Sequence, residues 1–255
     1  AVADTAATLQ LLSHQGGQTT TVATESAEQF SGVAVAGGAD PAFLWTAYDG
    51  DQWSVTLQQR GEQRVLYAGT ANALGPALVR DDAGTLWYAW TSREGRTDTI
   101  HVGREGQAGT LTLPGRLPSL TAVDGGVAVC FEHPDNGAIH IYCATVVDGS
   151  LGSPIQVSSR QPLNFQPRCT TDAEGRVIVA WETGPAWGFD TRVEQFREIA
   201  LKQLSPSSGH VSPGPGTDDG LLPIPPHAYH RLKGRRTGHG MYLNMNPSNV
   251  RLLPA

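Results

Sequence analysis

The chain has 255 residues and a formal net charge of −6, with 24 acidic residues against 18 Lys and Arg. A negative protein lacks the global field that draws proteins to nucleic acid or to an anionic membrane surface. No window holds the roughly 18 consecutive apolar residues that a membrane-spanning helix needs. Nucleic-acid binding and membrane insertion are therefore not expected. Only 16% of residues are charged, and 30 Gly and 17 Pro favour many short strands with tight turns over a helical bundle.

Two short strands are expected near the N-terminus, at residues 8–12 and 19–23. From residue 33 onward the chain repeats, and the units span residues 33–70, 76–115, 118–158 and 167–211. Each clear unit begins with a proline and a short apolar strand, followed by an Asp/Gly turn. A second strand then ends in an aromatic residue, and a third and a fourth strand follow. The units that start at 76, 118 and 167 lie 42 and 49 residues apart, which is the period of a four-stranded propeller blade.

The repeat predicts a single all-β domain over residues 1–255, a β-propeller. Five blades of four antiparallel strands are favoured, with the last blade built from both termini, because closure removes exposed strand edges. Residues 191–204 are the one candidate helix, but the alternation over 197–204 favours a strand. An open array, or a larger ring completed by another chain, is the alternative. The sequence does not predict the oligomeric state.

The motif that carries the repeat is Pro-x-Leu…Asp-x-Gly…Trp, as in Pro76 to Trp90. Over residues 33–211 the chain resembles β-propellers in general. It more loosely resembles the bacterial-neuraminidase-repeat (sialidase-like) and the five-bladed glycosidase or lectin propellers. Residues 49–53, Asp-Gly-Asp-Gln-Trp, come nearest to the sialidase Asp box, Ser-x-Asp-x-Gly-x-x-Trp. The resemblance implies a propeller fold and leaves the activity open.

A disulfide follows from the geometry of one hairpin. Residues 136–137, Asn-Gly, are a strong signal for a two-residue turn, which places Cys130 directly opposite Cys143 in a non-hydrogen-bonded pair. Their Cα atoms would then lie ~4.5 Å apart, within the range of a disulfide. A disulfide would indicate an oxidising compartment, so a secreted or periplasmic protein is expected. Two buried thiols in a reduced protein are the alternative, and Cys169 is expected to be a core residue.

Loops that follow the second strands and loops that precede the first strands lie on the same face of a propeller. Side chains on such loops are expected to converge, because binding and catalytic residues concentrate on loops of a rigid scaffold. The candidates after the second strands are Asp49, Arg93, Glu132, His133 and Glu182, and those at the first strands are Arg116, Asn164, Gln166 and Arg168.

Glu132 and Glu182 occupy equivalent places in successive units, each directly after the terminal aromatic residue. Two such carboxylates could serve as the general acid and base of a glycoside hydrolase. Alternatively they are solvated or paired with Arg93 or Arg168. In a third reading, His133 takes a proton and Arg168 neutralises a uronate, as in a polysaccharide lyase.

The loop from Glu182 to Asp190 is the longest of its class and contains Trp187. An indole in a polar, Gly-flanked loop suits stacking on a sugar ring, with nearby polar groups bound to the hydroxyls. The alternative is that Trp187 covers the rim of the core. The predicted substrate-binding residues are Trp187, Asp190, Asp49, Arg93 and Arg168.

The remaining motifs indicate loops. The basic run at 230–236 is expected to be a solvated loop. His227, His230 and His239 stand in a Pro- and Gly-rich segment, where solvated histidines are the default and zinc the alternative. His133 pairs with His140 in the register of the Asn-Gly hairpin, but no third ligand is visible, so no metal or other cofactor is expected.

The sequence therefore predicts a carbohydrate-recognising propeller, either a glycoside hydrolase or lyase that uses Glu132, Glu182 and His133, or a lectin without turnover. A non-catalytic interaction module from a larger multidomain protein is the alternative.

Overall fold

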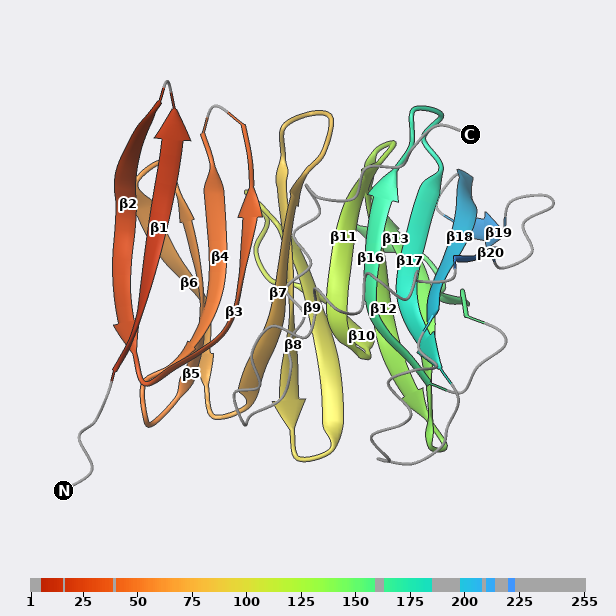
Figure 1. Cartoon of the computed structure of the whole chain (residues 1–255), viewed down its shortest axis with the longest axis horizontal. Helices are drawn as coiled ribbons and strands as arrows, with labels where there is room; N and C mark the ends of the chain where they lie inside the picture. The colour runs from red at the N-terminus through yellow and green to blue at the C-terminus, as the bar shows by residue number, and fades with distance from the viewer. Residues whose placement is uncertain are drawn as a thin grey trace. The chain divides into compact units, whose positions relative to one another are not determined.

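The computed structural model describes residues 6–15, 17–38, 40–158, 163–184, 198–207, 210–213 and 220–222. The chain divides into two compact units, Ala1–Leu222 and Pro223–Ala255, and the first is described below (Figure 1). Every helix-or-strand element in the described ranges is a β-strand. Within those ranges no helix is long and apolar enough to cross a membrane.

The first three sheets follow the chain order, and neighbours in sequence are hydrogen-bonded neighbours in space. A two-stranded sheet is formed by β1 (Ala7–Gln15) and β2 (Gln18–Ala27). The first four-stranded sheet contains β3 (Gln29–Ala36), β4 (Ala42–Tyr48), β5 (Trp53–Gln59) and β6 (Glu62–Gly69). The second contains β7 (Asn72–Arg80), β8 (Leu86–Glu94), β9 (Thr97–Arg104) and β10 (Leu111–Pro114).

Two more antiparallel sheets follow. One contains β11 (Arg116–Val123), β12 (Gly126–Asp135) and β13 (Ala138–Val147), with β14 (Ser150–Leu151) and β15 (Ile155–Gln156) both on β13. The other contains β16 (Leu163–Thr171), β17 (Val177–Gly184) and β18 (Glu198–Ser207), with β19 (His210–Pro213) and β20 (Gly220–Leu222) both on β18. A parallel bridge between Ile139 and Leu163 connects these two sheets.

The sheets pack face to face through their first strands, because β3 contacts β7, β7 contacts β11 and β11 contacts β16. Each interface is filled by alternate side chains of the central strands. Trp87 packs with Phe131 in one cluster, and Cys130 packs with Trp181 in the next. Burying each such aromatic side chain contributes about 1.5–3 kcal/mol. Antiparallel sheets stacked in this way are propeller blades, so the fold is all-β and of the β-propeller class, as the repeat predicted.

The blade boundaries differ from the prediction at the prolines. The first strands begin at Asn72, Arg116 and Leu163, several residues before Pro76, Pro118 and Pro167. Each proline lies at a register shift inside its strand. Proline has no N–H for the ladder, and a β-bulge is the place in a strand that tolerates it. The residue before each proline has a left-handed φ, namely 56° at Gly75, 51° at Leu117 and 51° at Gln166.

Residues 198–207 form the strand β18, which confirms the strand reading of that segment. The N-terminal pair takes the place of the third and fourth strands of a blade. Leu11 of β1 packs with Trp45 of the next sheet, just as Val55 of the third strand β5 packs with Trp90.

One face of β3 is left open by the described residues. Val35 is 56% exposed, whereas Leu120, at the equivalent position of β11, is 9% exposed and packs with Trp87 of the preceding sheet. The face that Val35 presents is the one that the first and second strands of a preceding blade would cover. The number of blades, and the sharing of the last blade by both ends of the chain, therefore remain predictions.

Replacing Val35 with cysteine tests that prediction. If further strands cover β3, a thiol reagent should label Val35→Cys at least ~10-fold more slowly than an exposed position, because labelling then needs local opening. Val65→Cys is the matched control, since Val65 is 60% exposed on the outer strand β6. The unsubstituted protein gives the background of its own thiols. Equal labelling rates at the two positions would show that β3 stays uncovered.

Candidate functional site

Arg93, Glu132 and Glu182, predicted to follow the second strands, lie inside β8, β12 and β17 instead, and they pair there with residues of the first strands. Arg93 pairs with Asn72 across β8 and β7, Glu132 with Arg116 across β12 and β11, and Glu182 with Phe165 across β17 and β16. The equivalence of Glu132 and Glu182 is thereby confirmed at the level of strand register.

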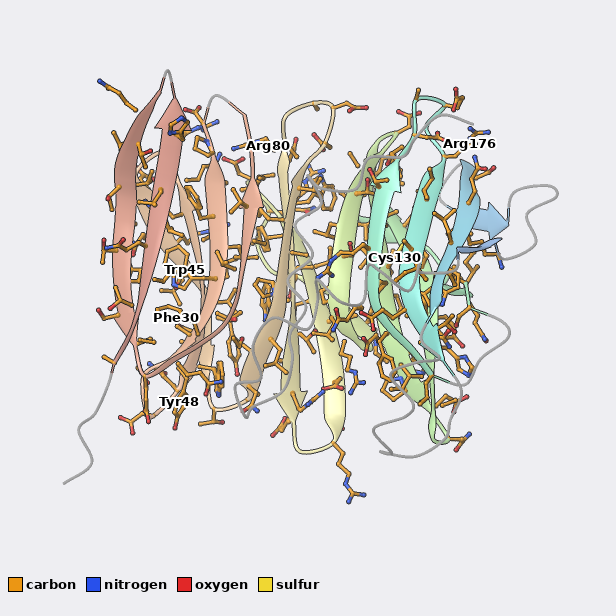
Figure 2. The ribbon with its side chains drawn as sticks, in the orientation of Figure 1. Phe30, Trp45, Tyr48, Arg80, Cys130 and Arg176 are labelled. Carbon is orange, nitrogen blue, oxygen red and sulfur yellow. The ribbon has the colours of Figure 1, made fainter. Side chains whose placement is uncertain are left out.

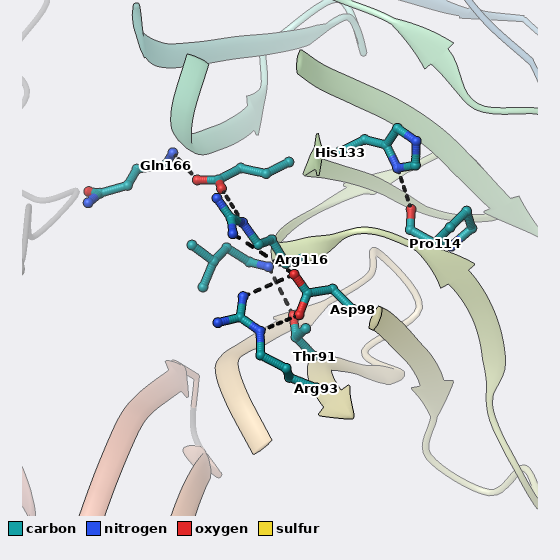
Figure 3. A network of polar contacts seen from close by, with 9 residues as sticks. Thr91, Arg93, Asp98, Pro114, Arg116, His133 and Gln166 are labelled. Atoms are coloured by element: carbon teal, nitrogen blue, oxygen red, sulfur yellow. Dashed lines mark hydrogen bonds and ion pairs between the residues drawn. The ribbon is translucent and has the colours of Figure 1, made fainter. Parts of the chain in front are cut away.

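Glu132 is the most deeply buried acidic group of this region, with its side chain 1% exposed. Arg116 Nε donates a hydrogen bond of 2.7 Å to Glu132 Oε2, and the backbone N–H of Gln166 donates one of 2.8 Å to Oε1 (Figure 3). Hydrogen bonds from charged groups of this kind compensate the desolvation of a buried carboxylate. Both oxygens of Glu132 are thus engaged by protein groups.

Asp98 extends this contact into a chain of charges. Arg93 donates to both of its oxygens, with Nε–Oδ1 at 2.6 Å and Nη2–Oδ2 at 3.0 Å, and Arg116 Nη1 lies 3.9 Å from Oδ2 (Figure 3). The Asp98 side chain is 7% exposed, whereas the arginine side chains are 35% exposed at Arg93 and 24% at Arg116. The carboxylates are therefore more deeply buried than the arginine side chains that bind them.

Glu132 also fills a position that recurs in the repeat. Thr91 follows the terminal Trp90 of β8, and its Oγ1 accepts a hydrogen bond of 2.9 Å from the N–H of Leu117. Leu117 precedes a proline at the bulge of the next sheet, as Gln166 does. Glu132 thus accepts a hydrogen bond from the bulge of β16, as Thr91 does from the bulge of β11. Each side chain fixes the first strand of the following sheet. The sequence reasoning missed this role, although the recurring residue after the terminal aromatic and the X-Pro step were visible in it.

Other predicted site residues have different places. Asp49 caps a turn, where Oδ1 accepts hydrogen bonds from the N–H groups of Gln52 at 2.9 Å and Asp51 at 3.1 Å. These bonds, that from Gln52 first, lower the pKa of the Asp49 carboxyl below its usual value. Arg168 is exposed and donates to the carbonyl of Pro167 at 3.1 Å. Glu182 is half-buried. Asp49 is thus engaged by its own turn, and Arg168 by a neighbouring carbonyl.

His133 pairs with His140, as predicted, and its Nδ1 lies 3.3 Å from the carbonyl oxygen of Pro114. Neighbouring residues of a strand point to opposite faces, so His133 points away from the side that carries Glu132. Within the described residues no group of three His, Cys, Asp or Glu side chains could hold a metal ion. Trp187, Asp190 and the histidines 227, 230 and 239 lie outside the described residues.

The hairpin register is confirmed. Asn136 and Gly137 have φ values of 45° and 84°, which define the predicted turn, and Cys130 pairs with Cys143. Their Sγ atoms lie 2.8 Å apart, longer than the ~2.05 Å of a disulfide bond. The disulfide predicted from the sequence is therefore not formed in this structure, in which both are free thiols. Facing positions in a ladder bring two thiols together, but they do not decide their oxidation state.

Cys169, which the sequence left without a partner, belongs to the same cluster. It packs in the core with Cys130, and its Sγ lies 3.3 Å from the carbonyl oxygen of Ser119. Burial, with contacts from Cys143 and Cys169, raises the pKa of the Cys130 thiol well above its usual value.

The fold and this network define a β-propeller with a buried, charge-paired polar region at the ends of its second strands. No known family model matches the chain, and no curated protein matches it. Among solved structures, TolB from Acinetobacter baumannii is similar, with a TM-score of 0.52 and 18% identity over 81% of this chain. The match spans 48% of the TolB chain, so this chain corresponds to about half of that protein.

Two glycoside hydrolases also align. One is a thermostable family-43 glycoside hydrolase, with a TM-score of 0.49 and 12% identity over 76% of this chain and 77% of the other. The second is the GH93 α-L-arabinofuranosidase of Fusarium graminearum, with a TM-score of 0.48 and 10% identity over 76% of this chain and 65% of the other. At these identities the comparison with TolB shows a shared fold and nothing about activity.

The anchoring role of Glu132 predicts a large effect of Glu132→Gln on stability. The variant removes the 2.7 Å contact of Arg116 with a carboxylate and leaves it the 3.9 Å contact with Asp98. The free energy of unfolding should fall by about 1.5–3 kcal/mol, the value of a hydrogen bond to a charged group. Urea denaturation of the variant and of the unsubstituted protein measures this difference in the free energy of unfolding. Glu94→Gln, at the exposed end of β8, should stay within about 0.5 kcal/mol. An unchanged free energy of unfolding for Glu132→Gln would contradict the anchoring role.

Proposed function

We propose that this propeller binds carbohydrate on the face that carries Arg93 and Arg116. The observation that carries the proposal is a pair of guanidinium groups that are fixed by ion pairs with the buried carboxylates of Asp98 and Glu132. A guanidinium presents its donors in a rigid planar fork, and less side-chain entropy is lost when that fork is already oriented. Such donors suit the hydroxyl and carboxylate oxygens of a sugar.

Neighbouring groups add what a sugar site needs besides donors. Phe165 and Gln166 are half-buried at the start of β16, and the N–H of Gln166 is bonded to Glu132, which fixes the backbone there. Ligand sites commonly combine an apolar or aromatic surface with a few fixed polar groups. The pyranose ring offers matching C–H faces and hydroxyl edges.

Binding without turnover fits the contacts of Glu132 best. A general acid must reach the glycosidic oxygen, but both Glu132 oxygens are bonded to Arg116 and Gln166. Glu132 is therefore a positioning residue in this proposal, and Glu182 is the remaining carboxylate on which hydrolysis would depend.

A glycan array followed by calorimetry tests the proposal. Arg93→Gln should weaken glycan binding by roughly 10-fold or more, since a charge-assisted hydrogen bond is worth about 1.5–3 kcal/mol. Arg80→Gln is the matched control, because Arg80 pairs with Leu86 at the other end of the β7–β8 ladder from Arg93 (Figure 2). An array without any bound glycan would refute the proposal. Turnover that disappears in Glu182→Gln would establish an enzyme instead of a lectin.

We also propose that the protein works in an oxidising compartment, secreted or periplasmic, with Cys130 bonded to Cys143. The support is their facing register and the 2.8 Å between their Sγ atoms. Peptide mapping under non-reducing conditions should recover the linked pair. A reductant should lower the free energy of unfolding by about 3 kcal/mol, the value for a loop of this length. Cys143→Ala should abolish that dependence on reductant. A Cys130–Cys169 link, or no link, would show that the pairing is wrong.

A further inference from the structure

We infer that the carbohydrate recognised on this face is acidic, and that Arg93 and Arg116 together form the receptor for a uronate carboxylate. The inference rests on the proposed function and names the class of its ligand.

The first argument is the burial of the charges. Asp98 and Glu132 are 7% and 1% exposed, whereas Arg93 and Arg116 are 35% and 24% exposed. The more exposed members of the cluster are therefore its two cations. An anionic ligand that approaches the exposed parts of these arginine side chains meets cations first, and such charges attract over roughly one Debye length, ~8–10 Å. A neutral sugar would gain no such charge–charge attraction.

The second argument is the spacing of the two guanidinium groups. Both approach the same oxygen of Asp98, with Arg93 Nη2 at 3.0 Å and Arg116 Nη1 at 3.9 Å from Oδ2 (Figure 3). The pair is therefore close enough for one carboxylate to contact both. A ligand carboxylate that reaches the exposed parts of both arginine side chains would bridge them as the Asp98 carboxylate does. Paired N–H···O bonds of this kind are the strong, geometrically specific ones.

The third argument is rigidity. Arg116 is bound at Nε by Glu132, and Glu132 is fixed in turn by the N–H of Gln166 from the next sheet. Arg93 is bound at Nε and Nη2 by Asp98. Neither side chain has to be ordered when a ligand arrives, which removes a cost of about 0.5–1.5 kcal/mol for each. The network therefore presents a preformed site.

The test compares uronate oligosaccharides with their methyl esters, which keep the sugar and linkage and lose the charge. Calorimetry on the full chain, with oligogalacturonate as the first probe of a uronate panel, should show at least ~10-fold tighter binding of an acid than of its ester. Raising the salt from 0.05 to 0.5 M should lower the affinity for the acid and leave the affinity for the ester unchanged, because salt screens only charged pairs. Arg93→Gln should remove most of the preference for the acid, and Arg80→Gln should keep it.

Arg93→Gln is chosen because the Arg116–Glu132 pair that holds the next sheet stays intact in it, and its thermal melting verifies the fold. Arg116→Lys serves as a second variant, which keeps the charge and loses the planar fork. Equal affinity for acid and ester, or binding of neutral glycans alone, would overturn the inference. The proposed function, carbohydrate binding, would still hold. Binding of no glycan at all overturns the proposed function as well.

Discussion

The contact on which this structure depends is the hydrogen bond between the end of one sheet's second strand and the bulged first strand of the next sheet. The X-Pro step creates the bulge, because proline removes one donor and the preceding residue turns into left-handed backbone. The N–H of that residue then needs an acceptor, since an unpaired buried amide is costly. Thr91 supplies one and Glu132 supplies another. Successive sheets are therefore held in register by a side chain and not only by apolar packing.

The candidate site is a consequence of using a carboxylate for this contact. Thr91 is neutral and needs no charged partner. Glu132 brings a charge into the core, and a buried charge requires a cation nearby. Arg116 provides it, and Asp98 and Arg93 continue the chain of ion pairs towards the solvent. A structural requirement between two sheets thus orders two guanidinium groups at the surface. That is why the proposed binding residues and the residue that holds the sheets belong to one network.

Prediction from the sequence succeeded where the signal is local. The Asn136–Gly137 turn fixes the register of its hairpin by counting, and Cys130 does lie opposite Cys143. It is wrong at the prolines, which mark bulges inside the first strands and not the starts of those strands. It also missed the partners of Glu132, for which it offered Arg93 or Arg168, because the groups that bind its oxygens come from other strands: Arg116 is 16 residues away and Gln166 is 34.

The amino-acid sequence by itself determined the repeat, the four-stranded unit and the pairing inside each hairpin, because strand alternation and turn chemistry act between residues close in the chain. The tertiary structure alone decided which charges are buried and which partner each one has. Those depend on how the face of one sheet lies on the next, and hydrophobic alternation specifies that a face is buried without specifying what covers it. The burial of Glu132 and the pairing of Arg93 and Arg116 through Asp98 belong to that second level.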